Sequence, residues 1–410
     1  MQRKHLFALI AILIIAVMAL SACGGSKATE APKPAEKPAA EAPQKEEAKP
    51  TEAPKKEEAK PTEAPQKEEA KPTEAPAEDE VKPADEIVVY NWSDYVAPEM
   101  YEMFTERTGI KIGEDNFSSN EDLLAKLQGG ATGYSVIVPS DYTVAIMIEE
   151  GLLQELDHDN IPNLKNLDPE FTKLYYDPGN KYCVPYLWGT TGLGYNTELL
   201  ETPPSSWKGV FEAQESDPWY GRMTLLDDVR EVFSAALIYL GYDNNTKDEA
   251  QLEEAKNLLI SAKKGLAGYD TDNYEDLVGA GENLLAHGWN GDFLQAADEY
   301  ENISYYIPEE GGTIWIDNMC IPAGISPEEK LAAEMYINFV LDPEVGKMLG
   351  EYNYYATPNK ESLKIADPEY KENPLVFPPD EIRAKLRFIK PLGEFESVYQ
   401  RMWDEVKSAQ

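Results

Sequence analysis

The chain of 410 residues has few of the side chains that perform acid–base, metal or thiol chemistry. It contains only three histidines and three cysteines. His158 and His287 do not have the spacing of zinc ligands, and no Cys-x-x-Cys pair is present. The sequence also lacks a phosphate-binding loop, a Gly-x-Ser-x-Gly elbow and a His-Glu-x-x-His motif. We therefore expect a protein that is not an enzyme and has no cofactor and no metal site.

Basic residues are scarce as well. The chain has 37 lysines and arginines but 75 aspartates and glutamates, and the net charge is −38. A phosphate backbone is bound by clustered Lys and Arg, so nucleic acid is not an expected partner. A strongly acidic surface attracts a cationic ligand. The same charge would also serve solubility or adaptation to salt, so charge alone does not identify the ligand.

Long apolar runs are absent except at the N-terminus. Arg3 and Lys4 precede the apolar residues 6–20, which are too few and wrongly flanked for a transmembrane helix. Residues 1–23 are therefore predicted to be a signal peptide. Leu20-Ser21-Ala22-Cys23 resembles the bacterial lipobox, which implies cleavage before Cys23, acylation of that residue and a lipid-anchored protein outside the cytoplasmic membrane. An ordinary secretion signal is the alternative.

Residues 24–86 are dominated by Pro, Glu, Lys and Ala, and the run Lys-Pro-Thr-Glu-Ala-Pro begins at Lys49, Lys60 and Lys71. The segment has too little apolar surface to offset the entropy of an ordered chain. Its prolines favour an extended, semi-stiff spacer. We predict a disordered tether here. It contains 11 lysines and 17 acids, so most of the negative charge belongs to residues 87–410.

Residues 87–410 alternate strand-like and helix-like segments, which predicts an α/β fold. The apolar run 87–90 is expected to be a buried strand, and Trp92, Ser93, Asp94 and Tyr95 a loop after it. Residues 135–138 are expected to be another buried strand, and the same Ser-Asp-Tyr triplet follows at residues 140–142. Ligands of open α/β sheets bind at such strand ends. The repeat predicts a shared crevice for a small cation, although Asp94 could instead cap a helix and the rings could be core residues.

Other segments pair rings with acids. Asp228 and Glu231 lie three apart at a predicted helix start and can face one side, but acids there also simply cap the helix. Trp315 and Asp317 lie two apart in an extended run and share one face of it. Residues 284–293 are expected to form a strand with a turn, which contains Trp289-Asn290-Gly291-Asp292.

Two further patterns concern structure only. Ser326-Pro327-Glu328-Glu329 has the spacing of a capping box and predicts a helix that runs through Leu341. Cys183 and Cys320 are flanked by apolar residues and are either buried thiols or a disulfide, which the sequence alone does not decide.

Taken together, these segments resemble the spermidine/putrescine-binding proteins of ABC importers over nearly all of residues 87–410. The resemblance implies a two-lobed fold of the type II periplasmic-binding-protein class, with crossing strands as a hinge. Lobe one would comprise 87–190 and 316–362, and lobe two 191–315 and 363–410. The segments that carry the resemblance are Tyr90-Asn91-Trp92-Ser93-Asp94-Tyr95, Pro139-Ser140-Asp141-Tyr142, Val184-Pro185-Tyr186-Leu187-Trp188-Gly189-Thr190-Thr191-Gly192, Leu226-Asp227-Asp228-Val229-Arg230-Glu231-Val232-Phe233, Trp289-Asn290-Gly291-Asp292, Trp315-Ile316-Asp317 and Tyr355-Ala356-Thr357-Pro358-Asn359.

The resemblance also implies the roles of individual residues. Rings would hold the methylene chain of a polyamine, and acids would meet its ammonium groups. Ile389 stands, in a loose alignment, where spermidine binders have a glutamine, which puts the central contacts of the longer amine in doubt. The expected rings are Trp92, Tyr95, Tyr142, Trp289, Trp315 and Tyr355, the principal acids Asp228, Glu231 and Asp317, and the assisting residues Ser93, Asp94, Ser140 and Asp292.

The resulting expectation is a monomeric binding lipoprotein that delivers putrescine, spermidine or both to the permease and ATPase subunits of an importer. The preference between the two amines stays open. The alternatives are a binding protein of the same fold for another solute, such as iron or an anion, and a glycoside hydrolase that uses paired acids. Basic residues are scarce in the motifs, which disfavours an anion.

Overall fold

The computed structural model of the protein describes residues 81–409. The predicted signal peptide, Cys23 and nearly all of the predicted tether lie outside this range. The described chain begins against the folded part: the Ala84 amide donates to the Glu328 carbonyl at 2.9 Å, and the first strand starts at Glu86. Within residues 81–409, no helix is both long enough and apolar enough to cross a membrane.

The described strands form one mixed sheet in the order β2-β1-β3-β9-β4-β7-β5-β6, with β8 paired to β4 and β10 to β9. Strands β1, β2 and β3 are parallel, as are β5, β6 and β7, whereas β4 and β9 run antiparallel to each other between these two groups. The strands are β1 Glu86–Trp92, β2 Lys111–Phe117, β3 Val136–Ile137, β4 Cys183–Asn196, β5 Met223–Leu225, β6 Gly268–Tyr269, β7 Leu285–Trp289, β8 Ile303–Tyr306, β9 Thr313–Cys320 and β10 Arg387–Phe388.

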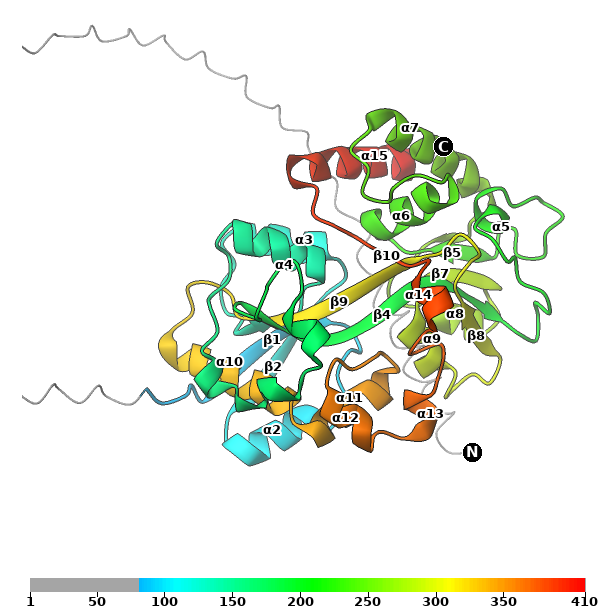
Figure 1. Cartoon of the computed structure of the whole chain (residues 1–410). Helices are drawn as coiled ribbons and strands as arrows, with labels where there is room; N and C mark the ends of the chain where they lie inside the picture. The colour runs from blue at the N-terminus through cyan, green and yellow to red at the C-terminus, as the bar shows by residue number, and fades with distance from the viewer. Residues whose placement is uncertain (1–80, 410) are drawn as a thin grey trace, which may run out of the picture. The chain divides into compact units, whose positions relative to one another are not determined.

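Helices cover this sheet on both sides (Figure 1). The predicted capping box is present: the Ser326 hydroxyl accepts from the Glu329 amide, and the Glu329 carboxylate accepts from the Ser326 amide. The helices are α2 Met100–Thr108, α3 Asn120–Gln128, α4 Asp141–Glu149, α5 Lys208–Phe211, α6 Val229–Tyr239, α7 Glu249–Ala262, α8 Tyr274–Gly279, α9 Asn290–Ala296, α10 Pro327–Val340, α11 Pro343–Asn353, α12 Lys360–Ile365, α13 Pro368–Lys371, α14 Asp380–Arg383 and α15 Glu396–Ser408.

The molecule is a two-lobed α/β protein with a separate hydrophobic core in each lobe. In the first lobe, β1 and β3 pack against α2 and α10. In the second lobe, β5 and β7 pack against α6, α7 and α15. Strand β4 crosses between them, since Val184 and Tyr186 belong to the first core and Leu193 to the second. Strand β9 runs beside β4 in the opposite direction, and both join the lobes in Figure 1.

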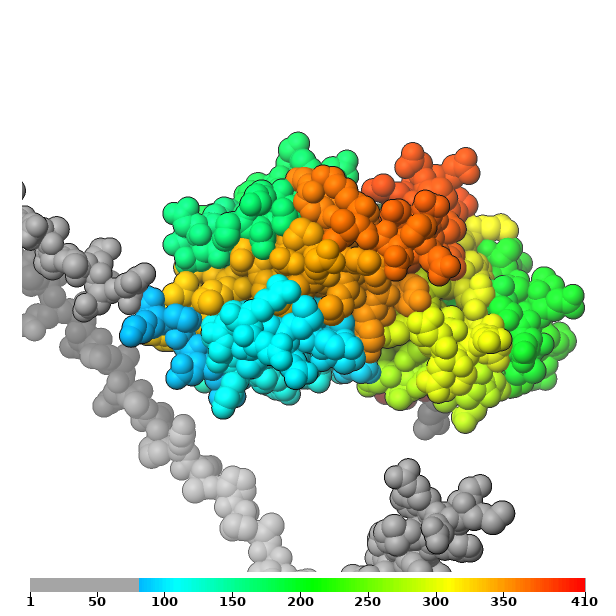
Figure 2. Space-filling model, turned by 90° about the horizontal axis from the view of Figure 1, so that it is seen from below, coloured from blue at the N-terminus to red at the C-terminus, as the bar shows by residue number. Residues whose placement is uncertain are grey.

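Helices α11, α12 and α13 lie over the junction of the lobes, as the view from below shows (Figure 2). The chain around them packs on the crossing strands: Ala356 and Tyr370 form a small core with Trp188 of β4 and with Ile314 and Ile316 of β9. One face of the crossing strands β4 and β9 is therefore covered by apolar side chains.

Cys183 and Cys320 form a disulfide between β4 and β9, where the two residues face each other in the sheet register. This settles the choice that the sequence left open in favour of the bond. A cystine buried at the first-lobe end of both crossing strands ties these strands together.

Two local expectations were wrong. Trp92 is the last residue of β1 and not part of the following loop, because the register with β2 continues to Phe117. Residues 290–293 open helix α9 instead of continuing a strand with a turn. Because Asn290 is the first helical residue, Asp292 lies in the first turn of α9, where the helix dipole favours a carboxylate.

Candidate functional site

A cavity of about 550 Å³ lies where the ends of β1 and α4 in the first lobe and strand β9 face α6, β7 and α9 of the second lobe. Its size suits a small organic molecule. The structure brings all thirteen predicted ligand-contacting residues to its wall, and Ile389 lies there too. These residues are Trp92, Ser93, Asp94, Tyr95, Ser140, Tyr142, Asp228, Glu231, Trp289, Asp292, Trp315, Asp317 and Tyr355.

Asp317 lies in β9 and is only 4% exposed. The Ser140 hydroxyl donates to Oδ1 at 2.6 Å, and the Tyr95 hydroxyl donates to Oδ2 at 3.0 Å. Asn120 fixes Ser140 in turn, since its Nδ2 donates to the Ser140 hydroxyl at 3.0 Å and its Oδ1 accepts from the Ser140 amide at 2.9 Å. The carboxylate therefore has one orientation, set by neutral donors.

Glu231 is held from the two crossing strands. Thr191 of β4 donates to Oε1 at 2.9 Å, and Thr313 of β9 donates to Oε2 at 2.6 Å. Asp228 is the N-cap of α6, because its Oδ1 accepts from the amides of Arg230 and Glu231, each at 2.9 Å. The capping alternative is therefore correct for Asp228, which also lines the cavity.

Asp292 receives two phenol hydroxyls, one from each side. Tyr274 donates to Oδ2 at 2.5 Å, and Tyr355 donates to Oδ1. The Tyr274 oxygen also accepts from the Trp289 amide at 3.1 Å. One buried phenol thus positions both the acid and the ring of the Trp289–Asp292 segment.

Aromatic rings form the rest of the wall. The Trp92 ring of the first lobe and the Trp289 ring of the second meet edge to face, with centroids 5.8 Å apart. Tyr355 packs edge to face on Tyr95 at 5.4 Å and on Trp315 at 5.1 Å. Such rings contact hydrocarbon and also attract cations to their faces.

Two glycines of the sequence motifs make room for these rings. A Cβ atom at Gly189 would lie 2.6 Å from Cζ2 of Trp315. A Cβ atom at Gly291 would lie 2.5 Å from the Tyr355 ring. Any larger residue at either position would displace an aromatic wall of the cavity.

Ser93 and Asp94 are exposed and lie at the mouth of the cavity. Asp94 has a left-handed backbone with φ of 51°. It does not cap α2, whose N-cap is Glu99 without a side-chain bond. The capping alternative is therefore wrong for Asp94, whereas Tyr95, only 4% exposed, also packs in the first-lobe core.

Every charged residue that lines the cavity is an acid. Burial raises the pKa of Asp317 to about 7, although the Ser140 and Tyr95 hydrogen bonds act in the opposite direction. Burial and then the charge of Asp228 raise the pKa of Glu231 to about 8, against the hydrogen bonds from Thr313 and Thr191. The pKa of Asp292 is also raised, chiefly by burial. A cation placed among these carboxyls would lower their pKa values, because it favours the ionised form.

Several residues of the site were not predicted from the sequence. Asn120 orients Ser140, which donates to Asp317, and Tyr274 orients Asp292. Glu275 follows Tyr274, and burial and then the charge of Asp292 raise its pKa to about 8. The acidity of residues 270–276 was a usable signal for this edge of the cavity. Further acids of the wall are Asp141, Asp272, Asp276, Asp298, Glu299 and Glu351.

The arrangement can bind an elongated cation whose carbon chain contacts rings and whose charged ends meet carboxylates. Within residues 81–409, no cluster of three or more His, Cys, Asp or Glu side chains has the arrangement of a metal site. Hydroxyl donors hold the carboxylates of Asp317, Glu231 and Asp292, and backbone amides hold that of Asp228.

Residues 99–378 match the model of a family described as bacterial extracellular solute-binding protein. The putrescine-binding periplasmic protein PotF of Escherichia coli is 34% identical over 337 residues, which cover 78% of this chain and 90% of the relative. The spermidine/putrescine-binding periplasmic protein of the same organism is 35% identical over 321 residues, with the same two coverages. A solved relative, the substrate-binding protein PotD of Streptococcus pneumoniae, has a TM-score of 0.65 and 32% identity, and the match covers 79% of this chain and 99% of PotD.

Proposed function

Because the chain belongs to the bacterial extracellular solute-binding proteins, we propose that it captures putrescine and spermidine between its two lobes for an ABC importer. One observation carries the proposal: a cavity between the lobes is walled by aromatic rings, and its charged residues are all acids. A polyamine alternates methylene carbons with fixed positive charges, so it complements both features. The thirteen predicted residues are its proposed contacts, and the ligand leaves unchanged because the protein has no reaction to perform.

In this proposal the lobes comprise residues 87–190 with 316–362 and residues 191–315 with 363–410. Each moves as a unit when the cleft closes on the amine. The permease and ATPase subunits of the importer then receive the closed, monomeric complex.

A thermal-shift panel of amines, sugars, anions and metal ions tests this function. A ligand that binds only the folded protein raises its apparent melting temperature by mass action. We expect a rise with putrescine and spermidine and none with sugars or anions. A rise with a sugar alone would favour the glycosidase alternative, and a rise with an anion or a metal ion would favour another solute.

The affinity for both amines is expected to fall as the pH is lowered from about 8 to about 6. The raised pKa values of Asp317 and Glu231 mean that these carboxyls take up protons in this range in the free protein. The amines resemble lysine and stay charged, with pKa values near 10. Binding of the amine must therefore release these protons. For each proton released, the association constant falls by up to about tenfold when the pH is lowered by one unit.

Calorimetry at pH 6, 7 and 8, in buffers of different ionisation enthalpy, measures both the affinity and the protons released. Constant affinity with no proton release would mean that these carboxylates are already ionised or do not meet the ligand.

Asp292→Ser is expected to weaken putrescine binding more than spermidine binding. Asp292 is one of the few acids at its end of the cavity that hydroxyl donors hold in place. The shorter diamine has fewer other contacts to compensate for the loss. Asp298→Ser is the matched control, because Asp298 lines the same cavity but is exposed. Titrations of both amines give the ratio of affinities, and equal losses in Asp292→Ser would defeat this account of specificity.

We further propose that Cys23 carries the lipid that anchors the protein on the outer side of the cytoplasmic membrane. Cys23→Ala should then move the protein from the membrane fraction to the soluble fraction, because the acyl chains supply the membrane affinity. Recovery of the variant in the membrane fraction, at the wild-type level, would contradict the lipobox interpretation.

A further inference from the structure

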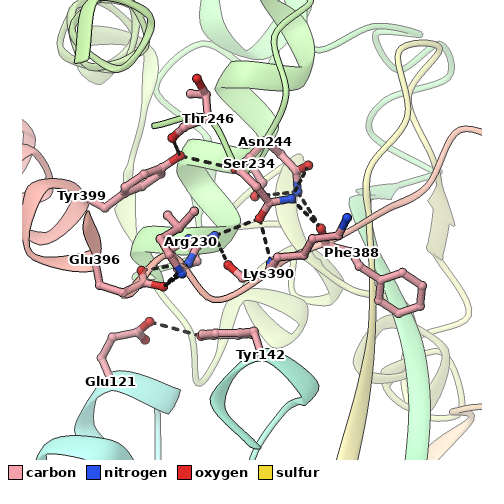
Figure 3. Close-up of polar contacts among 12 residues, drawn as sticks. Glu121, Tyr142, Arg230, Ser234, Asn244, Thr246, Phe388, Lys390, Glu396 and Tyr399 are labelled. Carbon is pink, nitrogen blue, oxygen red and sulfur yellow. Dashed lines mark hydrogen bonds and ion pairs between the residues drawn. The ribbon is translucent and has the colours of Figure 1, made fainter. Parts of the chain in front are cut away.

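Arg230 is a buried cation directly behind the wall of the cavity. It lies in α6 between Asp228 and Glu231 in sequence, and it is only 1% exposed. Its Nη1 contacts both carboxylate oxygens of Glu396 at 2.8 Å, and its Nη2 donates to the Lys390 carbonyl at 3.1 Å (Figure 3). The guanidinium is thus fixed by the C-terminal segment of the second lobe.

The same guanidinium reaches the first lobe. Its central carbon lies 5.6 Å from the ring centroid of Tyr142 in α4 and 5.0 Å from that of Tyr399 in α15. The Tyr142 hydroxyl donates to Glu121 of α3 at 3.1 Å. Figure 3 shows Tyr142 and Glu121 facing the Arg230–Glu396 pair across the junction. One cation therefore lies between an aromatic ring from each lobe.

This contact has an electrostatic reason. Closing the cleft brings acids of both lobes together, and the cavity wall has no basic residue of its own. Burial, and then the charge of Asp228, raise the pKa of Glu121 to about 8. The charge of Arg230 lowers this pKa. Arginine stays charged at every relevant pH and stacks well on aromatic faces. Arg230 thus offsets the repulsion at the Glu121–Asp228 end of the cleft.

We propose that Arg230 is a positioning residue for closure: it docks on Tyr142 and attracts Glu121, so that one end of the cleft closes on the protein's own cation. The amine then has to bridge only the remaining carboxylates. The inference goes beyond the proposed function, since this contact involves no ligand atom and exists for any solute. A purely local role for Arg230 is the alternative, in which it only fixes Glu396 and Lys390 within the second lobe.

Hydrogen exchange of the full-length, ligand-free protein separates the two roles. We expect Arg230→Met to increase exchange in the first-lobe helices, at residues 119–128 and 140–146, although no residue of that lobe is changed. Arg230→Lys keeps the charge but loses the Nη2 contact with the Lys390 carbonyl and the planar group between the two rings. It should give a smaller increase, and it replaces Arg230→Met in the test if that variant does not fold. Arg107→Met is the control for loss of a cation–ring contact, because Arg107 is exposed and its central carbon lies 5.1 Å from the centroid of the Phe339 ring, entirely within the first lobe.

The second measurement is the dissociation constant of putrescine for wild type, Arg230→Lys, Tyr142→Leu and the double variant. We expect about a tenfold weakening for Arg230→Lys and a double variant no worse than Tyr142→Leu, because Arg230 affects binding through its contact with Tyr142, whereas Tyr142 also lines the cavity. Exchange that rises only at residues 388–400, or losses that add, would overturn the proposal. Wild-type protein that binds no amine would sink the proposed function, yet the exchange result would still decide the role of Arg230.

Discussion

Asp317→Asn is expected to weaken the binding of both putrescine and spermidine by about 2–5 kcal/mol. This corresponds to a rise in the dissociation constant of roughly 30-fold to several thousand-fold. The carboxylate is buried, and both of its oxygens already accept from the neutral hydroxyls of Ser140 and Tyr95. Asparagine keeps the shape but removes the charge and turns an N–H towards one of these hydroxyls. A bound ammonium group would then be desolvated without its partner.

The matched control for this variant is Asp177→Asn. Asp177 is equally buried, accepts from the amides of Lys181, Tyr182 and Cys183, and does not line the cavity. The Asp177→Asn variant should have a lower melting temperature and unchanged dissociation constants for both amines. Calorimetric titration of both variants separates binding from stability, and wild-type affinity in Asp317→Asn would mean that the ligand does not meet this acid.

Glu231→Gln is expected to have the second largest effect, a loss of about 2–4 kcal/mol for either amine. Thr191 and Thr313 fix both oxygens of this carboxylate on the strands that join the lobes. The acid can therefore meet an ammonium group without losing side-chain freedom. Glutamine removes the charge. It also turns an N–H towards a threonine hydroxyl that donates to the carboxylate in the wild-type protein.

Thr313→Val separates the charge of Glu231 from its orientation. The variant keeps the carboxylate and removes one of its two donors, so it should weaken binding by about 0.5–1.5 kcal/mol, the value of one hydrogen bond. If Thr313→Val costs as much as Glu231→Gln, then packing at the hinge, and not the charge of Glu231, controls affinity.

The sequence predicted which residues gather at this cavity because strands and helix starts leave local signals. The repeated Ser-Asp-Tyr triplet follows β1 and β3, which are neighbours in the sheet, so adjacency of the two loops was correct. The period-two spacing of Trp315 and Asp317 placed both on one face of β9, and both line the cavity. The capping box at Ser326 fixed the start of α10.

Other features depend on distant partners and leave no such signal. Tyr274 contacts Asp292 only because α8 packs beside α9, and Asn120 meets Ser140 only because α3 and α4 are adjacent. The disulfide required the antiparallel register of β4 and β9, because the two cysteines are 137 positions apart in the sequence. The helix at Asn290 was missed because Gly291 discourages a helix, whereas here it admits the Tyr355 ring.

Calorimetric titration of the wild-type protein with putrescine, spermidine and butane-1,4-diol at pH 8 tests the central claim most directly. The diol has the carbon chain of putrescine and none of its charge. The account predicts saturable binding of one amine per chain, competition between the two amines, and no binding of the diol. Absence of saturable binding by either amine, or binding of the diol as tight as that of putrescine, would contradict it.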